Sequence, residues 1–197
     1  MPTIYYMRHG ETDWNVEGRL QGGIDTPLNA LGLGQAAHAG RVLADLLAGQ
    51  RREASNLAFV ASPLQRARAT MEIVRKELGL PPGGYALDDR LREIGYGHWA
   101  GSTLGQAKVS HPELYASRVR DKWGALPPRG ESYASVELRM RDWYDSLKAD
   151  TIAVAHGGTA RALMVALGIE TAARASDLYI EQGVVYVFGD DRVAKYS

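Results

Sequence analysis

Histidine, arginine and serine residues follow three short apolar runs of the chain, directly or within five residues. The runs and the residues that follow them are 3–7 before Arg8-His9-Gly10, 57–61 before Ser62 and Arg66, and 151–155 before His156-Gly157-Gly158. Arginine suits a phosphoryl group because its planar guanidinium donates two parallel hydrogen bonds. Two arginines and two histidines brought to one place would therefore form an anion site suited to a phosphoryl group.

The order of the predicted strands and helices indicates where these residues meet. Patterning predicts strands at 3–7, 57–61, 151–155 and 184–188, and helices at about 30–47, 63–78, 133–147 and 159–167. Nearly continuous apolar strands alternating with helices indicate an α/β fold, a three-layer α/β/α sandwich with a mostly parallel central sheet. Ligands of such sheets bind beyond the carboxyl ends of the strands, where the polar clusters would lie together. Helices that begin after Ser62 and Gly158 would add free N–H groups to this anion site.

Local signals predict several boundaries. Ser62 and Pro63 suit the N-cap and first residue of the second helix, and Gly79 and Gly168 suit the ends of the second and fourth. Residues 189–191 are typical of a hairpin turn that leads into a last strand at 192–196. Between residues 81 and 128 the periodicity weakens while glycine, proline and aromatic residues accumulate. We therefore expect one domain over residues 1–197, with about 81–130 as a partial lid over one end of the sheet.

Composition excludes several classes of function. The 197 residues include 23 Lys and Arg and 23 Asp and Glu, so the chain lacks the basic excess of a nucleic-acid-binding protein. It has no cysteine, which excludes disulfides, thiolate metal sites and cysteine nucleophiles. No apolar run approaches the roughly 18 residues of a membrane span, and the first residues lack a signal-peptide layout. We expect a cytoplasmic protein with a small phosphorylated substrate, without a nucleic-acid or membrane partner; the sequence does not indicate its oligomeric state.

Four blocks of residues extend the pattern well beyond Arg-His-Gly, which alone is a weak signal. The first is Arg8-His9-Gly10-Glu11-Thr12, Trp14-Asn15, Gly18-Arg19-Leu20-Gln21-Gly22, Asp25-Thr26-Pro27-Leu28 and Leu31-Gly32; the second is Ser62-Pro63-Leu64, Arg66-Ala67 and Thr70; the third is Arg92-Glu93-Ile94, Gly97 and Trp99-Ala100-Gly101; the fourth is His156-Gly157-Gly158. In this order, from residue 3 to about 168, they resemble the motifs of the histidine phosphatase superfamily, whose members share the phosphoglycerate mutase-like fold.

The resemblance implies roles for individual residues. His9 would accept the phosphoryl group, and Glu93 would protonate the leaving oxygen and later activate water. The residues around the phosphoryl oxygens would be Arg8, Arg66 and His156, and further phosphate or substrate contacts would come from Asn15, Gln21, Gly22 and the backbone N–H of Gly157. A phosphohistidine splits a very slow hydrolysis into two easier steps. Arginines and a cationic histidine can stabilise the equatorial oxygens, so no metal or other cofactor is expected.

Three functions are compatible with these residues. We expect a metal-independent phosphomonoesterase that hydrolyses a small phosphorylated metabolite through a phosphohistidine on His9. The alternatives are a cofactor-dependent phosphoglycerate mutase and, less favoured because the catalytic set is intact, an inactive binding protein. Mutases typically continue the third block with Asn-Lys, read His-Gly-Asn-Ser in the fourth and carry a longer insertion between them. Here the corresponding residues are Ser102-Thr103, His156-Gly157-Gly158-Thr159 and the short Pro127–Ser132 segment, which favours the phosphatase branch. The sequence does not specify the substrate.

Several other residues have a structural as well as a functional interpretation. His98 and Asp89 are alternative acids to Glu93, although we favour a structural role for His98. Three aromatic residues either pack in the core or contact substrate: Trp14, Tyr96 and Trp99. Four basic residues either lie at the rim of the pocket or face solvent: Lys108, Arg118, Arg120 and Lys122. Residues 32–37 have the spelling of a dinucleotide-binding fingerprint but lack the preceding strand, and we find no catalytic metal-ligand motif.

Overall fold

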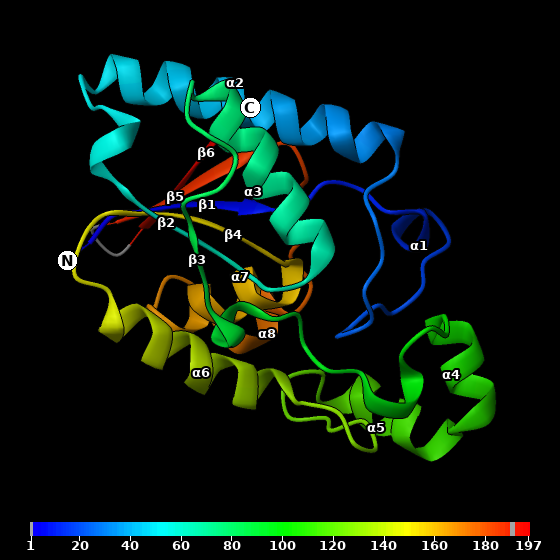
Figure 1. The fold of residues 1–197 in the computed structure, drawn as a ribbon. Coiled ribbons are helices and arrows are strands. Elements are labelled where there is room, and N and C mark those ends of the chain that lie inside the picture. Colours follow the sequence, from blue (N-terminus) through cyan, green and yellow to red (C-terminus); the bar gives the residue numbers. More distant parts are fainter. Residues whose placement is uncertain (1, 190–191) are drawn as a thin grey trace.

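The computed structural model describes residues 2–189 and 192–197, which include a six-stranded sheet between helical layers (Figure 1). The strands are β1 (Ile4–Arg8), β2 (Ala58–Ala61), β3 (Ala86–Leu87), β4 (Thr151–Ala155), β5 (Val185–Gly189) and β6 (Arg192–Tyr196). The helices are α1 (Asp13–Val16), α2 (Ala30–Gly49), α3 (Gln65–Glu77), α4 (Leu104–Ser110), α5 (Pro112–Arg120), α6 (Tyr133–Ser146), α7 (Gly157–Ala166) and α8 (Ala172–Ala175). The sheet order is β3-β2-β4-β1-β5-β6; the first four strands in that order are parallel, and the β1–β5 and β5–β6 pairs are antiparallel.

Side chains of β1 alternate between two hydrophobic cores. Ile4 and Tyr6 pack in the core beneath α6 and α7, whereas Tyr5 and Met7 pack in the core beneath α2 and α3. All four side chains are at most 1% exposed. A central strand covered on both faces has no solvent-facing positions, which explains why its sequence is a continuous apolar run. Figure 1 shows α2 and α3 on one side of the sheet and α6, α7 and α8 on the other, so the predicted three-layer sandwich is confirmed.

Strand register brings three polar segments to one edge of the sheet. Residue Arg8 of β1 pairs with Ala155 of β4, and Ala61 of β2 pairs with Val154. One residue further on, the N–H of His9 donates to the carbonyl of Ala155 at 3.0 Å, and the N–H of Ser62 donates to that of Val154 at 3.0 Å. His9, Ser62 and His156 therefore leave three adjacent strands side by side.

The predicted N-cap of α3 is wrong, whereas the predicted helix ends are confirmed. Helix α3 begins at Gln65 with Leu64 at its N-cap, because the Ser62 hydroxyl is committed to a hydrogen bond with the His156 ring. Gly79 and Gly168 follow α3 and α7 with φ of 72° each, the left-handed conformation that ends a helix and favours glycine.

The segment 81–130 contains more regular structure than the sequence pattern indicates. It forms β3, the 3₁₀ turns Asp89–Leu91 and Gly97–Trp99, and helices α4 and α5. The N–H of Leu20 donates to the carbonyl of Ser102 at 2.9 Å, and that of Gly101 donates to the carbonyl of Leu20 at 2.8 Å. These bonds tie the segment to the first motif block, and Figure 1 shows α4 and α5 on the same side of the molecule as α1.

The C-terminal strands β5 and β6 pair as an antiparallel ribbon, as the sequence predicts. The predicted turn between them falls on residues 190–191, which lie outside the described residues. Along the parts of the chain that the structure describes, no helix combines the length and the apolarity needed to cross a membrane.

Candidate active site

A cavity of about 170 Å³ lies beyond the carboxyl end of β1. Seven of the predicted site residues line it: Arg8, His9, Asn15, Gln21, Arg66, Glu93 and Gly157. The other two, Gly22 and His156, contact residues that do: the Gly22 carbonyl accepts from Arg66, and the His156 ring lies against that of His9. The structure thus brings the nine residues of four distant sequence blocks into one site.

His9 is buried at 2% exposure, with both ring nitrogens engaged. The Arg66 Nε donates to its Nε2 at 3.2 Å, and its Nδ1 lies 2.7 Å from the carbonyl oxygen of Gly10. Because a guanidinium only donates and a carbonyl only accepts, the proton resides on Nδ1 and Nε2 keeps a lone pair. Burial, and then the charges of Arg66 and Arg8, hold the pKa of His9 well below 6.5. The ring is therefore neutral near pH 7, the form of an imidazole that can act as a nucleophile.

Two glycines fix the loop that carries His9. A Cβ on Gly10 would lie 2.1 Å from the carbonyl oxygen of Gly32, and a Cβ on Gly32 would lie 2.1 Å from that of Glu11. The loop and the first turn of α2 can therefore touch only without side chains at these positions. Gly32 lies inside α2, which Asn29 caps, and no strand directly precedes that helix, so residues 32–37 do not form a dinucleotide-binding turn.

Arg66 is completely buried and shares its donors between His9 and a loop. Its Nη1 donates to the carbonyl of Ile24 at 2.8 Å and its Nη2 to that of Gly22 at 2.9 Å. Burial lowers the pKa of Arg66 to about 10, which still leaves it cationic at neutral pH. Gly22 adopts a φ of 53° and does not line the cavity. Its carbonyl holds the Arg66 guanidinium in position.

Arg8 has a buried donor without a partner. Its Nη1 donates to the carbonyl of Ile180 at 2.7 Å, and its guanidinium lies 5.8 Å from the centre of the Tyr179 ring. Its Nε is buried and makes no hydrogen bond within the described residues. An unpaired charged donor is costly away from water, so this atom is suited to receive an anionic oxygen.

His156 caps α7 and lies against His9. The two ring centres are 5.1 Å apart, and the His156 Nε2 shares a hydrogen bond with the Ser62 hydroxyl at 2.8 Å. The Tyr6 hydroxyl donates to the His156 carbonyl at 2.7 Å and accepts from its N–H at 3.0 Å, which fixes the backbone turn. Burial, followed by the charge of Arg66, holds the pKa of His156 well below 6.5. The expectation of a cationic histidine is therefore wrong for the free site, where this ring is neutral and its buried Nδ1 has no partner.

Glu93 reaches the cavity from the other side. Its Oε1 accepts from the N–H of Ile94 at 2.9 Å and from the N–H of Gly158, in the first turn of α7, at 3.1 Å. A Cβ on Gly158 would lie 2.3 Å from that oxygen, so the missing side chain lets the carboxylate approach. Glu131 accepts from the N–H of Gly95 at 2.8 Å and steadies the same loop. A neutral imidazole, several arginines and one carboxylate thus face one small cavity, an arrangement suited to phosphoryl transfer.

Comparison with known families agrees with this chemistry. The family described as histidine phosphatase superfamily (branch 1) matches residues 4–191, nearly the whole chain. The chain belongs to the histidine phosphatase superfamily.

Relatives within the histidine phosphatase superfamily include both mutases and phosphatases. A 2,3-bisphosphoglycerate-dependent phosphoglycerate mutase of Beijerinckia indica is 30% identical, with 94% of this chain and 90% of the relative covered. A glucosyl-3-phosphoglycerate phosphatase of Mycobacterium tuberculosis is 36% identical, with 83% and 74% covered. The solved structure of a mycobacterial glucosyl-3-phosphoglycerate phosphatase is 30% identical with a TM-score of 0.77, covering 94% of this chain and 89% of that one.

The histidine phosphatase cavity also contains residues to which sequence reasoning assigned no role. They are Arg19, Leu20, Arg161 and Tyr179, together with Tyr96, which was left between packing and substrate contact. Arg161 follows Gly157 by four residues on α7, a spacing that places both on one helix face and could have revealed it. Tyr179 lies in an irregular segment, where no sequence signal indicates a position.

Other candidates lie outside this cavity. His98 and Asp89 are exposed and do not line it, and Trp99 is buried in the third block. The basic residues Arg118, Arg120 and Lys122 line a different cavity beside α5. Among the described residues, no group of three His, Cys, Asp or Glu side chains is placed to hold a metal ion.

The lowered pKa values of His9 and His156 predict that mild acid weakens the fold. Unfolded histidines take up protons near pH 6.5, whereas the folded chain keeps both rings neutral to lower pH. The unfolded state therefore binds more protons in this window, and the free energy of unfolding falls as the pH drops below about 6.5, until the folded pKa values are reached. For two groups the slope approaches about 2.7 kcal/mol per pH unit. Urea unfolding between about pH 7 and 5.5 measures it.

A histidine substitution identifies the source of this slope. His156→Asn should remove about half of the slope, because one buried titrating ring is lost. His38→Asn is the matched control, since His38 is exposed on α2 and should leave the slope unchanged. The explanation fails if His156→Asn keeps the full wild-type slope.

Proposed function

We propose that the chain is a phosphomonoesterase that hydrolyses a small phosphorylated metabolite through a phosphohistidine on His9. The observation that carries this proposal is the His9 ring, neutral and with its Nε2 lone pair beside Arg66 in the cavity. A cavity of about 170 Å³ has room for a phosphoryl group and a few further atoms. Its charged lining residues are four arginines and Glu93. This excess of positive charge favours a phosphoryl dianion.

The first step forms a bond from His9 Nε2 to phosphorus and breaks the bond from phosphorus to the ester oxygen. Glu93 gives that oxygen its proton, so an alcohol leaves rather than an alkoxide. In the second step a water attacks phosphorus, the bond to His9 breaks and Glu93 takes back a proton. Free phosphate leaves, and the enzyme returns to its starting state.

Donors around His9 suit the equatorial oxygens. The unpartnered Nε of Arg8 gains a hydrogen-bond partner when a phosphoryl group is bound, and so does the Nδ1 of His156 in the tautomer whose Nε2 accepts from the Ser62 hydroxyl. The N–H of Gly157 lies in the first turn of α7, where free backbone donors favour an anion. Asn15 and Gln21 line the same cavity and contribute further polar contacts to the substrate.

Hydrolysis is favoured over transfer between phosphoglycerates. The chain has Ser102-Thr103 where mutases carry Asn-Lys, and only a short segment precedes its fourth block. Residues 81–130, proposed as a partial lid of the single domain, leave a phosphoenzyme more open to water than a longer insertion would.

A direct assay separates hydrolysis from transfer. We expect release of phosphate that does not depend on 2,3-bisphosphoglycerate, and negligible interconversion of 3- and 2-phosphoglycerate. Phosphate release and isomer ratio are measured in the same reaction, and a broad panel of phosphorylated metabolites identifies the substrate. Mutase turnover that equals or exceeds phosphate release would reverse the assignment.

Catalysis is expected to be independent of divalent metal, because arginines supply the positive charge around the phosphoryl group. Excess chelator should leave the rate unchanged, whereas vanadate should inhibit competitively by occupying the phosphoryl site. The rate is measured with and without chelator after extensive dialysis. Loss of activity that added magnesium restores would contradict this mechanism.

A further inference from the structure

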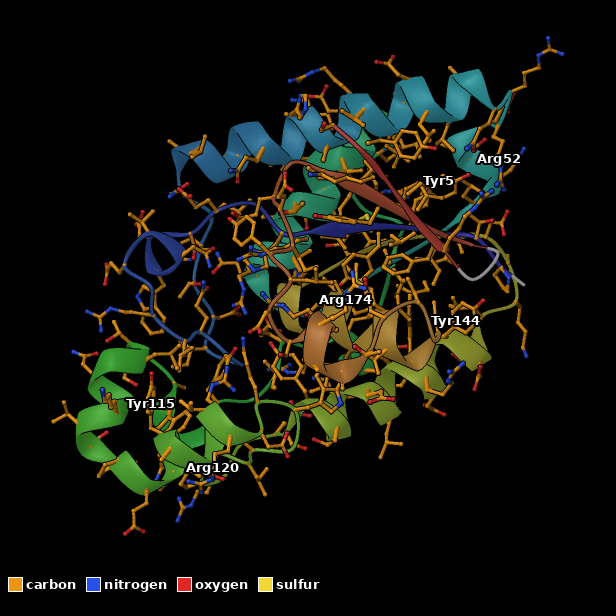
Figure 2. The ribbon with its side chains drawn as sticks, turned by 180° about the vertical axis from the view of Figure 1, so that it is seen from behind. Tyr5, Arg52, Tyr115, Arg120, Tyr144 and Arg174 are labelled. Atoms are coloured by element: carbon orange, nitrogen blue, oxygen red, sulfur yellow. The ribbon has the colours of Figure 1, made fainter. Side chains whose placement is uncertain are left out.

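A second cavity of about 650 Å³ lies between α5 and α8. Figure 2 labels Tyr115 and Arg120 on α5 and Arg174 on α8, the two helices that flank it. Its volume falls in the range of small-molecule sites. None of the described residues that line it also lines the cavity at His9, so a ligand in this place would be separate from the substrate.

An arginine without a partner lines this second cavity. Arg118 is only 8% exposed, and its side chain forms no hydrogen bond or ion pair with any other described residue. Arginine is rarely buried without a counter-charge, because desolvation of an unpaired cation is costly. An anionic ligand in the cavity would supply the missing partner.

Two carboxylates line the same cavity but are engaged elsewhere. Asp177 forms an ion pair with Lys122 at 2.9 Å, and the Oδ1 of Asp121 accepts from two backbone N–H groups, at 2.8 and 3.1 Å. Neither carboxylate lies within ion-pair distance of Arg118. A third basic residue, Arg120, adds to the positive charge of the lining. The cavity as a whole therefore favours an anion.

The uncharged part of the lining suits an aromatic ligand. Tyr115 and Trp123 contribute their rings, and four aliphatic residues complete the apolar wall: Leu104, Val119, Ala172 and Ala173. Small-molecule sites typically combine such apolar and aromatic surface with a few polar groups that fix the orientation of the ligand. Here the polar group would be Arg118, which favours a ligand with an anionic group on an aromatic ring system.

A layer of side chains separates the two cavities and connects them physically. Arg161, which lines the catalytic cavity, donates to the Tyr133 hydroxyl at 2.9 Å, and Tyr133 stacks at 5.0 Å on Trp123. Burial holds the pKa of Tyr96, a residue of the catalytic cavity, well above its ordinary value, and the charges of Arg118 and Arg161 act in the opposite direction. The charge of Arg118 thus reaches the catalytic cavity. An anion bound to it would reduce the positive potential that attracts a phosphoryl dianion.

We propose that the second cavity is a regulatory site in which Arg118 binds the anionic group of a small aromatic molecule while the substrate occupies the cavity at His9. The bound anion weakens substrate binding without displacing the substrate. Binding at Arg118 does not depend on the proposed phosphomonoesterase activity, whereas the effect on the substrate rests on it.

Matched probes test whether the cavity binds aromatic anions. Phenylacetate, naphthylacetate and biphenylacetate are each compared with the neutral amide by titration calorimetry, and acetate serves as the anion without a ring. We expect an acid to bind ~10- to 100-fold more tightly than its amide, the usual worth of a charge-assisted hydrogen bond. Acetate should bind more weakly than the arylacetates. Equal affinity of acid and amide, or no binding of any arylacetate at millimolar concentration, overturns the site.

Substitutions assign each ligand to its own cavity. Arg118→Gln should remove the preference for acid over amide and keep the affinity for vanadate, whereas Arg8→Gln should do the reverse. Arg118→Lys should keep part of the preference, since it keeps the charge. Arg141→Gln is the matched control, because Arg141 is exposed on α6 and lines neither cavity. A preference that survives in Arg118→Gln, or that is lost in Arg8→Gln, would place the probe elsewhere and overturn the site.

Kinetics test the effect on the substrate. With phenyl phosphate as substrate, a saturating arylacetate should raise KM to a plateau about fivefold higher and leave kcat little changed, and vanadate should weaken arylacetate binding by a similar factor, since coupling between sites is reciprocal. A KM that rises without limit indicates competition at His9 and overturns the proposal. Binding at Arg118 that leaves KM unchanged rejects the regulatory role. If phenyl phosphate is not hydrolysed, the proposed function is wrong, and the calorimetry alone decides the site.

Discussion

His9→Ala is expected to abolish turnover and phosphoenzyme formation together. The substitution removes the Nε2 lone pair that lies beside Arg66, and among the described residues no other histidine, serine, threonine or lysine lines the cavity. Loss of a catalytic nucleophile costs on the order of 10⁶-fold in kcat in well-studied hydrolases, so only background hydrolysis should remain. Steady-state rates and rapid-quench labelling with a ³²P-labelled aryl phosphate measure the two losses.

The control for His9→Ala removes a histidine that the mechanism does not use. His38 is exposed on α2, and His38→Ala should keep both the turnover and the label. Thermal unfolding of both variants shows that each is folded, since His9 is buried and its truncation leaves a cavity. An acid-labile label that survives in His9→Ala would place the phosphoryl group on another residue and reject the proposed intermediate.

The sheet and the catalytic residues at its edge were predictable because burial dictates their sequence pattern. The interior strands β1 and β4 are buried on both faces and read as apolar runs, and the polar residues directly after them have nowhere to lie except at the edge. The nine predicted site residues therefore meet in space. Their chemical roles remain predictions, since meeting in a cavity does not establish what each atom does.

Tertiary contacts explain why the N-cap of α3 was predicted wrongly and why β3 was not predicted. Ser62 has the sequence of an N-cap, yet its hydroxyl bonds to His156, a residue 94 positions away, so α3 begins later. Strand β3 has only two residues, both exposed, and leaves no apolar pattern to detect. In contrast, α4 and α5 carried local signals, the capping box of Thr103 with Gln106 and the proline that opens α5.

The second cavity could not be predicted from the sequence. Its walls come from α5 and from the segment around α8, which lie more than 50 residues apart and have no shared motif. The sequence pattern of Arg118 is that of an ordinary charged residue on a helix, and only packing shows that it is buried without a partner. Burial of this kind depends on how irregular segments pack, which periodicity does not encode.

Glu93→Gln is expected to reduce activity by an amount that depends on the leaving group. The amide oxygen can still accept from the N–H groups of Ile94 and Gly158, so the side chain should keep its place. It cannot donate a proton to an alkoxide, and general acid catalysis is typically worth ~10²- to 10⁴-fold. Alkyl phosphates should therefore lose activity by about that factor, and p-nitrophenyl phosphate much less, because p-nitrophenolate leaves without protonation. The measurement is kcat/KM for a series of monoesters whose leaving groups differ in pKa. We expect log kcat/KM to fall more steeply with leaving-group pKa in Glu93→Gln than in the wild type.

Glu131→Gln is the matched control for this acid role. Glu131 holds the N–H of Gly95 in the loop that carries Glu93, but it does not line the catalytic cavity. A displaced loop would lower the activity on all substrates by a similar factor. Glu131→Gln should therefore keep the wild-type dependence of activity on leaving-group pKa. Equal losses on alkyl and aryl phosphates in Glu93→Gln would remove Glu93 from the acid role. The next groups to test, His98 and Asp89, are exposed and outside the cavity, so either would have to act after a movement of the loop that carries Glu93.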